Sequence, residues 1–428
     1  MPSETSGQSG CTNMAYREYV NLVSDDDNEL IDDDDDEPQL SQAIAASLEE
    51  ASTVLENKSS LDLVYSLQHE NLHADSEDPV TITIQRKSIL PSTLRAINRT
   101  SFSFFQQVCI NFSGEDAIDG GGPKREYFRL LMKSIQEMGI FEGCWFSHDL
   151  SLLGDDKYAL AGKLVAWSIL QGGPGPRCMS DEGYNILCEK PYSCDGAIED
   201  VSEQHLKVLL RDIKNCTSEE NFTAVVDKYG DEISFHGFSR IYLSKLSNKD
   251  DILKCLLRQY FVFRVYAEVD QFFCGLNHIA GIGAMVKKHP SLFLTFLSAK
   301  VESIKLCQFK MLCNFSWSPE GSNARTREDS TVYCWEIFLQ DAEENQSDIT
   351  LQDVLVFITG ADNIPALGFP KPIDIHFYDN DLANNCRRRP WTSTCALTLN
   401  LPRGIEDPDE LSNLMKECIL NSPGFGKL

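Results

Sequence analysis

The sequence has no apolar run that approaches the about 18 residues needed to cross a lipid bilayer. Its first residues, MPSETSGQSG, contain neither the basic start nor the apolar stretch of a secretory signal peptide. These absences favour an intracellular protein in the cytoplasm, the nucleus or both, with no membrane partner. At 428 residues, with 42% apolar content, the chain is long enough for two or three domains.

Cysteine pairs at metal-binding spacing are also missing. The fifteen cysteines include no Cys-x-x-Cys pair, and the eight histidines do not stand beside them at zinc-finger spacing. An odd cysteine count without a secretory signal argues against a disulfide framework. We therefore expect no metal site and no cofactor, and we expect most cysteines to pack as small buried side chains.

Basic residues are scarce, because 38 Lys and Arg stand against 65 Asp and Glu and give a net charge of −27. Residues 1–60 contribute fifteen acidic residues and only two basic ones, Arg17 and Lys58. Nucleic-acid binding needs a basic surface, so this charge argues against a nucleic-acid partner.

The distribution of apolar residues divides the chain into four parts. Residues 1–78 are rich in Ser, Asp and Glu and are expected to form a mostly disordered acidic tail. Residues 79–317 alternate briefly as strands and then show helical periodicity, which predicts a large, mainly helical lobe. Residues 318–330, SPEGSNARTREDS, lack apolar periodicity and are predicted to be a linker. Residues 331–428 combine helices with the strand patterns IDIHF and CALTLNLP, so the predicted fold class is α+β, ending in a small α/β lobe.

Cys395 lies in RRPWTSTCALTLNLP, between a Pro-Trp pair and an alternating apolar segment. Composition alone favours a buried structural thiol at this position, because free cysteines are usually buried. A turn that enters a strand would instead leave the thiol open to a large partner. A thiolate is both a strong nucleophile and an adequate leaving group, which suits the transfer of a bulky acyl group.

Four segments, in this order, carry a family resemblance: FSGEDAIDGGGPKREYFRLL, FITGADNIPALGF, STCALTLNLP and the ending GFGKL. They resemble the Gly-Glu…Asp-x-Gly-Gly…Arg-Glu-Phe-Phe, Phe-x-Thr-Gly…Pro-Leu-x-Gly-Phe and Thr-Cys-x-x-x-Leu-x-Leu-Pro segments and the C-terminal phenylalanine of HECT-type ubiquitin ligase domains. The resemblance runs from about Pro79 to Leu428. The stretch GSN…R…E before the last lobe is most similar to a divergent branch of the family, which is typified by a mitotic-phase-specific ligase.

The resemblance implies a bilobal HECT-like fold and the activity of a ubiquitin-protein transferase. It implies that Cys395, preceded by Thr394, accepts ubiquitin from a conjugating enzyme as a thioester and passes it to substrate lysines. Phe425, fourth from the end, would act in this transfer. The implied partners are ubiquitin, a ubiquitin-conjugating enzyme and a protein substrate. Cys418, on the last predicted helix, is expected to remain a core residue.

Alternatives to a ligase remain open. Ser393 stands where family members usually have His, Ala396 stands where many have Phe, and the Asn-Lys-x-x-Tyr stretch of the conjugating-enzyme site is missing. These departures favour a catalytically degenerate HECT-like scaffold that binds ubiquitin- or SUMO-modified proteins. A cysteine hydrolase would need a base such as His376, but no peptidase signature surrounds it. The glycines at 120–122 lack the following Gly-Lys-Ser/Thr of a phosphate-binding loop and predict a structural turn.

The second of two apolar islands in the acidic tail is DDDDDEPQLSQAIAASLEE. Residues 37–50 match the spacing of a ubiquitin-interacting motif through Leu40, Ala43, Ser47 and Glu50. The preceding acidic run suits a helix N-terminus, and the small Ala43 would let ubiquitin's apolar patch come close. An ordinary amphipathic helix or a solvated charge run is the alternative.

The first island, YVNLVSDDDNE, resembles a SUMO-interacting motif over residues 20–27. Val20, Leu22 and Val23 would add a short strand to the edge of a partner's sheet, and the acidic residues that follow would meet a basic rim. The tail therefore predicts ubiquitin as a partner and, through this shorter pattern, SUMO.

Overall fold

The structure is a computed structural model of the chain. It describes residues 62–72, 79–115, 120–194, 196–300, 303–344, 346–379 and 389–421. Helices predominate among these residues and short strands accompany them, which confirms the predicted α+β class. In this part of the chain no helix is long and apolar enough to span a membrane, and no group of His, Cys, Asp and Glu could hold a metal ion.

The larger, N-terminal lobe (N-lobe) is mainly helical. Its elements in chain order are β1 (Val80–Ile84), η1 (Arg86–Ser88), α3 (Ile89–Ile97), β2 (Val108–Phe112), α4 (Gly122–Gln136), β3 (Phe141–Glu142), β4 (Trp145–Phe146), α5 (Leu150–Gly154), α6 (Lys157–Leu170), α7 (Asp181–Leu187), η2 (Ala197–Asp200), α8 (Gln204–Lys214), α9 (Glu219–Phe235), η3 (Ile241–Leu243), η4 (Leu246–Asn248), α10 (Lys249–Arg258), the π-helical η5 (Gln259–Phe263), α11 (Tyr266–His278), α12 (Ile282–Lys288) and α13 (Pro290–Leu297). The long apolar segment 250–273 is thus divided by the π-helical turn. Strands β1 and β2 pair in parallel.

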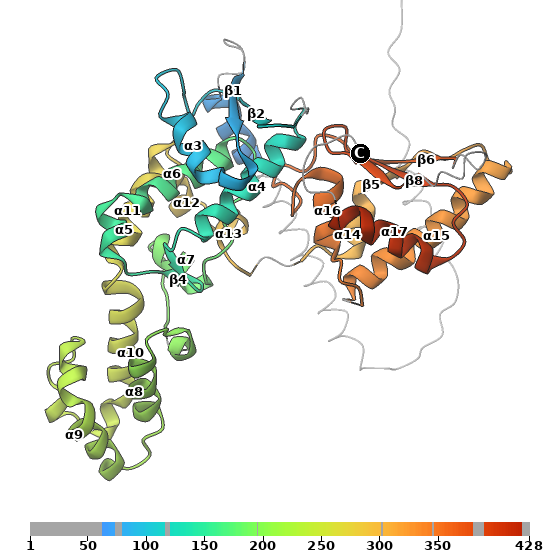
Figure 1. Ribbon diagram of the computed structural model, residues 1–428. Coiled ribbons are helices and arrows are strands. Elements are labelled where there is room, and N and C mark those ends of the chain that lie inside the picture. The colour runs from blue at the N-terminus through green and yellow to red at the C-terminus, as the bar shows by residue number, and fades with distance from the viewer. Residues whose placement is uncertain are drawn as a thin grey trace, which may run out of the picture. The chain divides into compact units, whose positions relative to one another are not determined.

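Two apolar cores support the N-lobe. In the first, Trp167 is fully buried and meets the rings of Tyr127 and Phe128 edge-on. Helices α6 and α11 approach so closely that a Cβ on Gly275 would lie 2.0 Å from the Ala159 carbonyl oxygen, so only glycine fits there. The second core joins α8, α9 and α10, which form a group of their own in Figure 1.

Part of the segment predicted as a disordered tail is helical. Residues 62–71 form a helix, whereas the sequence predicts disorder up to residue 78. Val64 and Leu67 are buried, and Leu67 joins the first core of the N-lobe. The Gln68 side chain donates to the Ile169 carbonyl at 3.3 Å. The prediction was wrong here because two buried apolar residues one helical turn apart are enough to anchor a short helix. Two residues hardly change the average composition of a 78-residue segment, so a prediction from composition does not detect them.

The smaller, C-terminal lobe (C-lobe) packs helices on a four-stranded sheet. Its elements are α14 (Leu306–Leu312), β5 (Cys313–Phe315), α15 (Asn323–Glu343), α16 (Leu351–Thr359), β6 (Ile373–Tyr378), β7 (Trp391–Ser393), β8 (Thr398–Pro402) and α17 (Pro408–Leu420). The strand order is β5-β6-β8-β7, and only β7 runs antiparallel to its neighbour. Ile375 and Leu399 on the inner face pack with Trp335 of α15, and Figure 1 shows α15, α16 and α17 beside this sheet.

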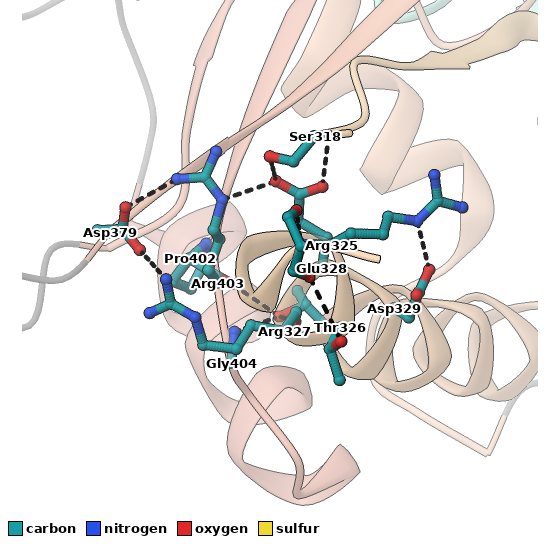
Figure 2. A network of polar contacts seen from close by, with 12 residues as sticks. Ser318, Arg325, Thr326, Arg327, Glu328, Asp329, Asp379, Pro402, Arg403 and Gly404 are labelled. Carbon is teal, nitrogen blue, oxygen red and sulfur yellow. Dashed lines mark hydrogen bonds and ion pairs between the residues drawn. The ribbon is translucent and has the colours of Figure 1, made fainter. Parts of the chain in front are cut away.

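The predicted linker over 318–330 is wrong. Helix α15 begins within it, and α14 and β5, which precede it, already belong to the C-lobe. The carboxylate of Glu328 is fully buried in α15 and accepts hydrogen bonds from Ser318 N at 2.8 Å, from Ser318 Oγ at 2.6 Å and from Arg403 Nε at 2.7 Å (Figure 2). The apolar periodicity predicts a helix only from Thr331 onward and misses its first turns, because the first buried positions, Glu328 and Thr331, are polar.

Candidate active site

Cys395 lies on the turn that joins β7 to β8. The sequence predicts that Cys395 lies on a turn entering a strand over residues 396–401; the structure has this turn at residues 394–397, and the strand begins two residues later than predicted, at Thr398. Leu397 is fully buried in a left-handed conformation with φ of 49°, which is rarely adopted by a residue other than glycine. Its carbonyl accepts a hydrogen bond from Asp374 N at 2.9 Å. The alternation of apolar residues was read correctly, but it cannot distinguish a tight turn from the start of a strand.

Side chains on both sides hold this turn in place. The Ser393 hydroxyl accepts a hydrogen bond from Ala396 N at 3.3 Å, so the residue that replaces the expected His caps the turn. Thr392 Oγ1 donates to the Phe357 carbonyl at 2.9 Å and ties β7 to α16. The ring of Trp391 lies 4.5 Å from that of Tyr378. Strained backbone that is held from several sides is common at functional sites.

The described cysteines of the C-lobe differ in exposure, and Cys307 is exposed while Cys313 is half-buried. Cys395 is half-buried, whereas Cys334 and Cys418 are buried. Burial raises the pKa of the Cys418 thiol to about 11, so this thiol stays protonated at neutral pH. Cys418 is therefore a core residue, as predicted.

Glycines 120–122 of the N-lobe lie against this turn. A Cβ on Gly120 would stand 3.0 Å from Cys395 Cβ and 3.4 Å from its Sγ, and a Cβ on Gly122 would stand 2.2 Å from Thr394 Oγ1. From the first turn of α4, Arg125 donates through Nε to the Thr359 carbonyl at 2.8 Å and through Nη2 to the Thr394 carbonyl at 2.5 Å. The glycines form the predicted turn, and the turn meets the segment that carries Cys395.

The structure brings Thr394 and Cys395 together with these N-lobe residues and leaves the other predicted site residues undescribed. Phe425 lies outside the described residues. So do the residues of the two tail motifs: Val20, Leu22, Val23, Leu40, Ala43, Ser47 and Glu50. His376, the base of the hydrolase alternative, pairs with Asn400 in the middle of β8 rather than with the turn.

Sequence reasoning missed the role of two residues. Arg125 belongs to the KREYF segment, but it donates to two backbone carbonyls of residues more than 230 positions later, and no sequence pattern marks them. Leu397 reads as an ordinary apolar strand residue because the sequence carries no glycine at the left-handed position.

Comparison with known proteins gives the same family that the four sequence segments resemble. The model of a protein family described as HECT-domain (ubiquitin-transferase) matches residues 123–427. The chain is similar to the G2/M phase-specific E3 ubiquitin-protein ligase of Homo sapiens, with 27% identity over 323 residues that cover 73% of this chain and 44% of the relative. It is 26% identical over 327 residues to the protein of the same name from Gallus gallus, covering 73% and 43%. It is 22% identical over 378 residues to the probable E3 ubiquitin-protein ligase HERC4 of Homo sapiens, covering 82% and 33%. The chain thus spans less than half the length of these relatives.

Proposed function

Because this chain belongs to the HECT-domain (ubiquitin-transferase) family, we propose that it is a ubiquitin ligase that carries ubiquitin as a thioester on Cys395. The observation that supports this most is the half-exposed thiol on a held turn at the junction of the two lobes. Buried cysteines such as Cys418 have raised pKa values and do not offer the same access.

The reaction uses two acyl transfers. The Cys395 thiolate attacks the carbonyl carbon of the ubiquitin thioester on the conjugating enzyme, the new C–S bond forms, and the enzyme's cysteine leaves as a thiolate that takes up a proton. A neutral lysine amine of the substrate then attacks the Cys395 thioester. An isopeptide bond forms, and the Cys395 sulfur leaves and is protonated. Thr394 precedes the nucleophile on the turn, and Phe425 seats the C-lobe during the second transfer.

We propose residues 235–243 as the place where the conjugating enzyme docks. Three large apolar side chains are exposed there: Phe235 by 87%, Tyr242 by 59% and Leu243 by 84%. Tyr242 is held against α9, because its hydroxyl donates to Asp231 at 2.7 Å and its ring packs so closely on Gly230 that a Cβ there would lie 2.7 Å from it. Large apolar side chains that gather at a surface mark a partner site. This group belongs to the middle of the N-lobe, the region the family uses for this partner.

The acidic tail is proposed to bind ubiquitin through residues 37–50 and SUMO through residues 20–27. The spacing of apolar and acidic residues supports this. A ligase with such a tail would hold modified substrates or growing chains near the site of transfer. We place this activity in the cytoplasm, the nucleus or both.

The test is a reconstituted reaction with activating enzyme, a panel of conjugating enzymes, ubiquitin and ATP. Wild-type protein should produce ubiquitin conjugates, Cys395→Ala should produce none, and Cys418→Ala should retain activity if its fold is retained by circular dichroism. Equal conjugate formation by wild type and Cys395→Ala would contradict the assignment. Absence of conjugates with every conjugating enzyme, together with retained ubiquitin binding, would favour the non-catalytic scaffold.

A further inference from the structure

We propose that Arg125 and glycines 120–122 form a docking site on the N-lobe that positions the Cys395 turn for discharge of the thioester to lysine. This inference rests on the proposed function and deepens it. Arg125 acts as a positioning residue, because its contacts are with backbone carbonyls rather than with the reacting sulfur.

Gly120 and Gly122 leave the space that the Thr394 and Cys395 side chains occupy. The atoms nearest to a Cβ built on Gly122 all belong to the C-lobe: Thr394 Oγ1 at 2.2 Å, Thr394 Cβ at 2.9 Å and Cys395 N at 3.0 Å. A Cβ built on Gly120 would also have only C-lobe atoms within 4 Å, namely Cys395 Cβ and Sγ. Neither glycine has a backbone conformation that requires glycine. The absence of side chains at these two positions therefore serves the contact between the lobes and not the folding of the N-lobe.

Arg125 joins two separate parts of the C-lobe. Thr359 is the last residue of α16, and a helix leaves its final carbonyls without partners inside the helix. A cation at this end also interacts favourably with the helix dipole. The other carbonyl, that of Thr394, immediately precedes the nucleophile. The planar guanidinium can reach both carbonyls at once, whereas a lysine ammonium on a flexible stem holds them less well.

The base of Arg125 is rigid. Its neighbours Tyr127 and Phe128 are fully buried in the N-lobe core. Glu126 accepts a hydrogen bond from Arg86 Nη1 at 2.6 Å, and the Arg86 guanidinium also binds Glu115 just before the glycine turn. A positioning group that projects from a fixed helix can define a site to a fraction of an ångström.

The docked turn suits discharge better than loading. During loading, a second folded protein must bring its own cysteine sulfur to Cys395 Sγ, but the N-lobe backbone lies so close to one side of that sulfur that a Cβ built on Gly120 would be 3.4 Å from it. During discharge, only a slender lysine side chain has to reach the thioester. We therefore expect the loss of docking to spare loading and to slow discharge.

The first experiment measures the two steps separately in the full chain. Arg125→Ala and Gly122→Ala should load from a charged conjugating enzyme within about twofold of wild type, and they should discharge to free lysine about 10- to 100-fold more slowly, as for other misplaced reacting groups. Arg125→Lys should discharge at an intermediate rate. Lys133→Ala on the exposed side of α4 and Gly154→Ala, where a Cβ meets open space, are the matched controls and should behave as wild type. Unchanged discharge, or loading reduced by the same factor as discharge, would overturn the proposal.

A second experiment does not depend on ubiquitin. Gly120→Cys places a thiol close enough to Cys395 for a disulfide after a small shift. Mild oxidation should yield the 120–395 cross-link, identified by peptide mass spectrometry, and adding Arg125→Ala should slow its formation. Formation of this cross-link in a protein that never loads ubiquitin would refute the proposed function while supporting the docking site. A Gly120→Cys protein that cross-links to Cys395 no faster than Gly154→Cys does would refute the docking site itself.

Discussion

The buried carboxylate of Glu328 is the most informative position for testing how the C-lobe is held together. It has no exposed surface, and it links the segment before α15, through Ser318, to the segment after β8, through Arg403 (Figure 2). Burial disfavours its charge, but the hydrogen bonds from Ser318 and Arg403 outweigh this effect, so the pKa of Glu328 lies below its ordinary value. Replacing Glu328 by Gln keeps the shape and removes the charge.

The expected loss can be bounded from these contacts. Hydrogen bonds to a charged group contribute about 1.5–3 kcal/mol, and breaking a buried ion pair from one side costs about 3–5 kcal/mol. Arg403 is 19% exposed and keeps its second partner, Asp379, at 2.9 Å, so the upper value does not apply in full. We expect Glu328→Gln to lower the unfolding free energy of the C-lobe by about 2–4 kcal/mol. With an m-value of about 2 kcal/mol/M, the urea midpoint should fall by about 1–2 M.

The assay is urea unfolding of the full chain, followed by hydrogen exchange of amides in α15 and β8, which report on the C-lobe alone. Asp329→Asn is the matched control, because Asp329 is the next residue on the same helix, is 55% exposed and pairs with Arg325 at 2.9 Å. This exposed pair should contribute about 0.5 kcal/mol or less. Equal midpoints for Glu328→Gln and Asp329→Asn would refute the view that the buried carboxylate anchors the lobe.

Three further predictions concern pH, partner docking and the tail. Because the pKa of folded Glu328 is lowered, its stabilisation is complete above the unfolded value of about 4.3 and is lost as pH falls through the folded value. The difference in urea midpoint between wild type and Glu328→Gln should therefore shrink below about pH 4, and a difference that grows there would contradict this sign. Leu243→Ser should slow loading by a charged conjugating enzyme, whereas Leu150→Ser, an equally apolar exposed change, should not; similar loading by both would argue against the docking patch. In a titration of peptide 30–55 with ubiquitin, substituting Ala43→Gly and Ser47→Ala should weaken binding, and equal affinity of the doubly substituted peptide would remove the ubiquitin-binding assignment.

The periodic elements of the C-lobe could be predicted from the sequence. The pattern LQDVLVFIT predicts a helix that ends before Gly360, and the structure has α16 from Leu351 to Thr359 with Gly360 in the left-handed conformation that ends it. IDIHF likewise becomes β6. In both segments the buried residues are apolar, so the spacing of apolar residues carries the information.

The same reasoning fails where the buried group is polar. The start of α15 buries Glu328 and Thr331, and their partners Ser318, Arg403 and Pro402 come from both sides of the helix in sequence. Only the folded lobe pairs these groups, so the segment reads as a polar linker. A pattern of apolar residues cannot reveal a helix whose burial depends on hydrogen bonds.

The site could be predicted only in part for a similar reason. A family motif identifies Cys395 as the candidate nucleophile, but the left-handed Leu397 and the contacts of Arg125 with two distant carbonyls follow from tertiary structure. Residue type alone gives no indication that the glycines at 120–122 leave space for Thr394 and Cys395.

The most direct test of the central claim is a single loading experiment with wild-type protein and a panel of charged conjugating enzymes, analysed on a non-reducing gel. A thioester on Cys395 should appear as a ubiquitin adduct that thiol reductant removes and that Cys395→Ala never forms. A wild-type protein that shows no reductant-sensitive adduct with any conjugating enzyme would contradict the account, and so would an adduct that persists in Cys395→Ala.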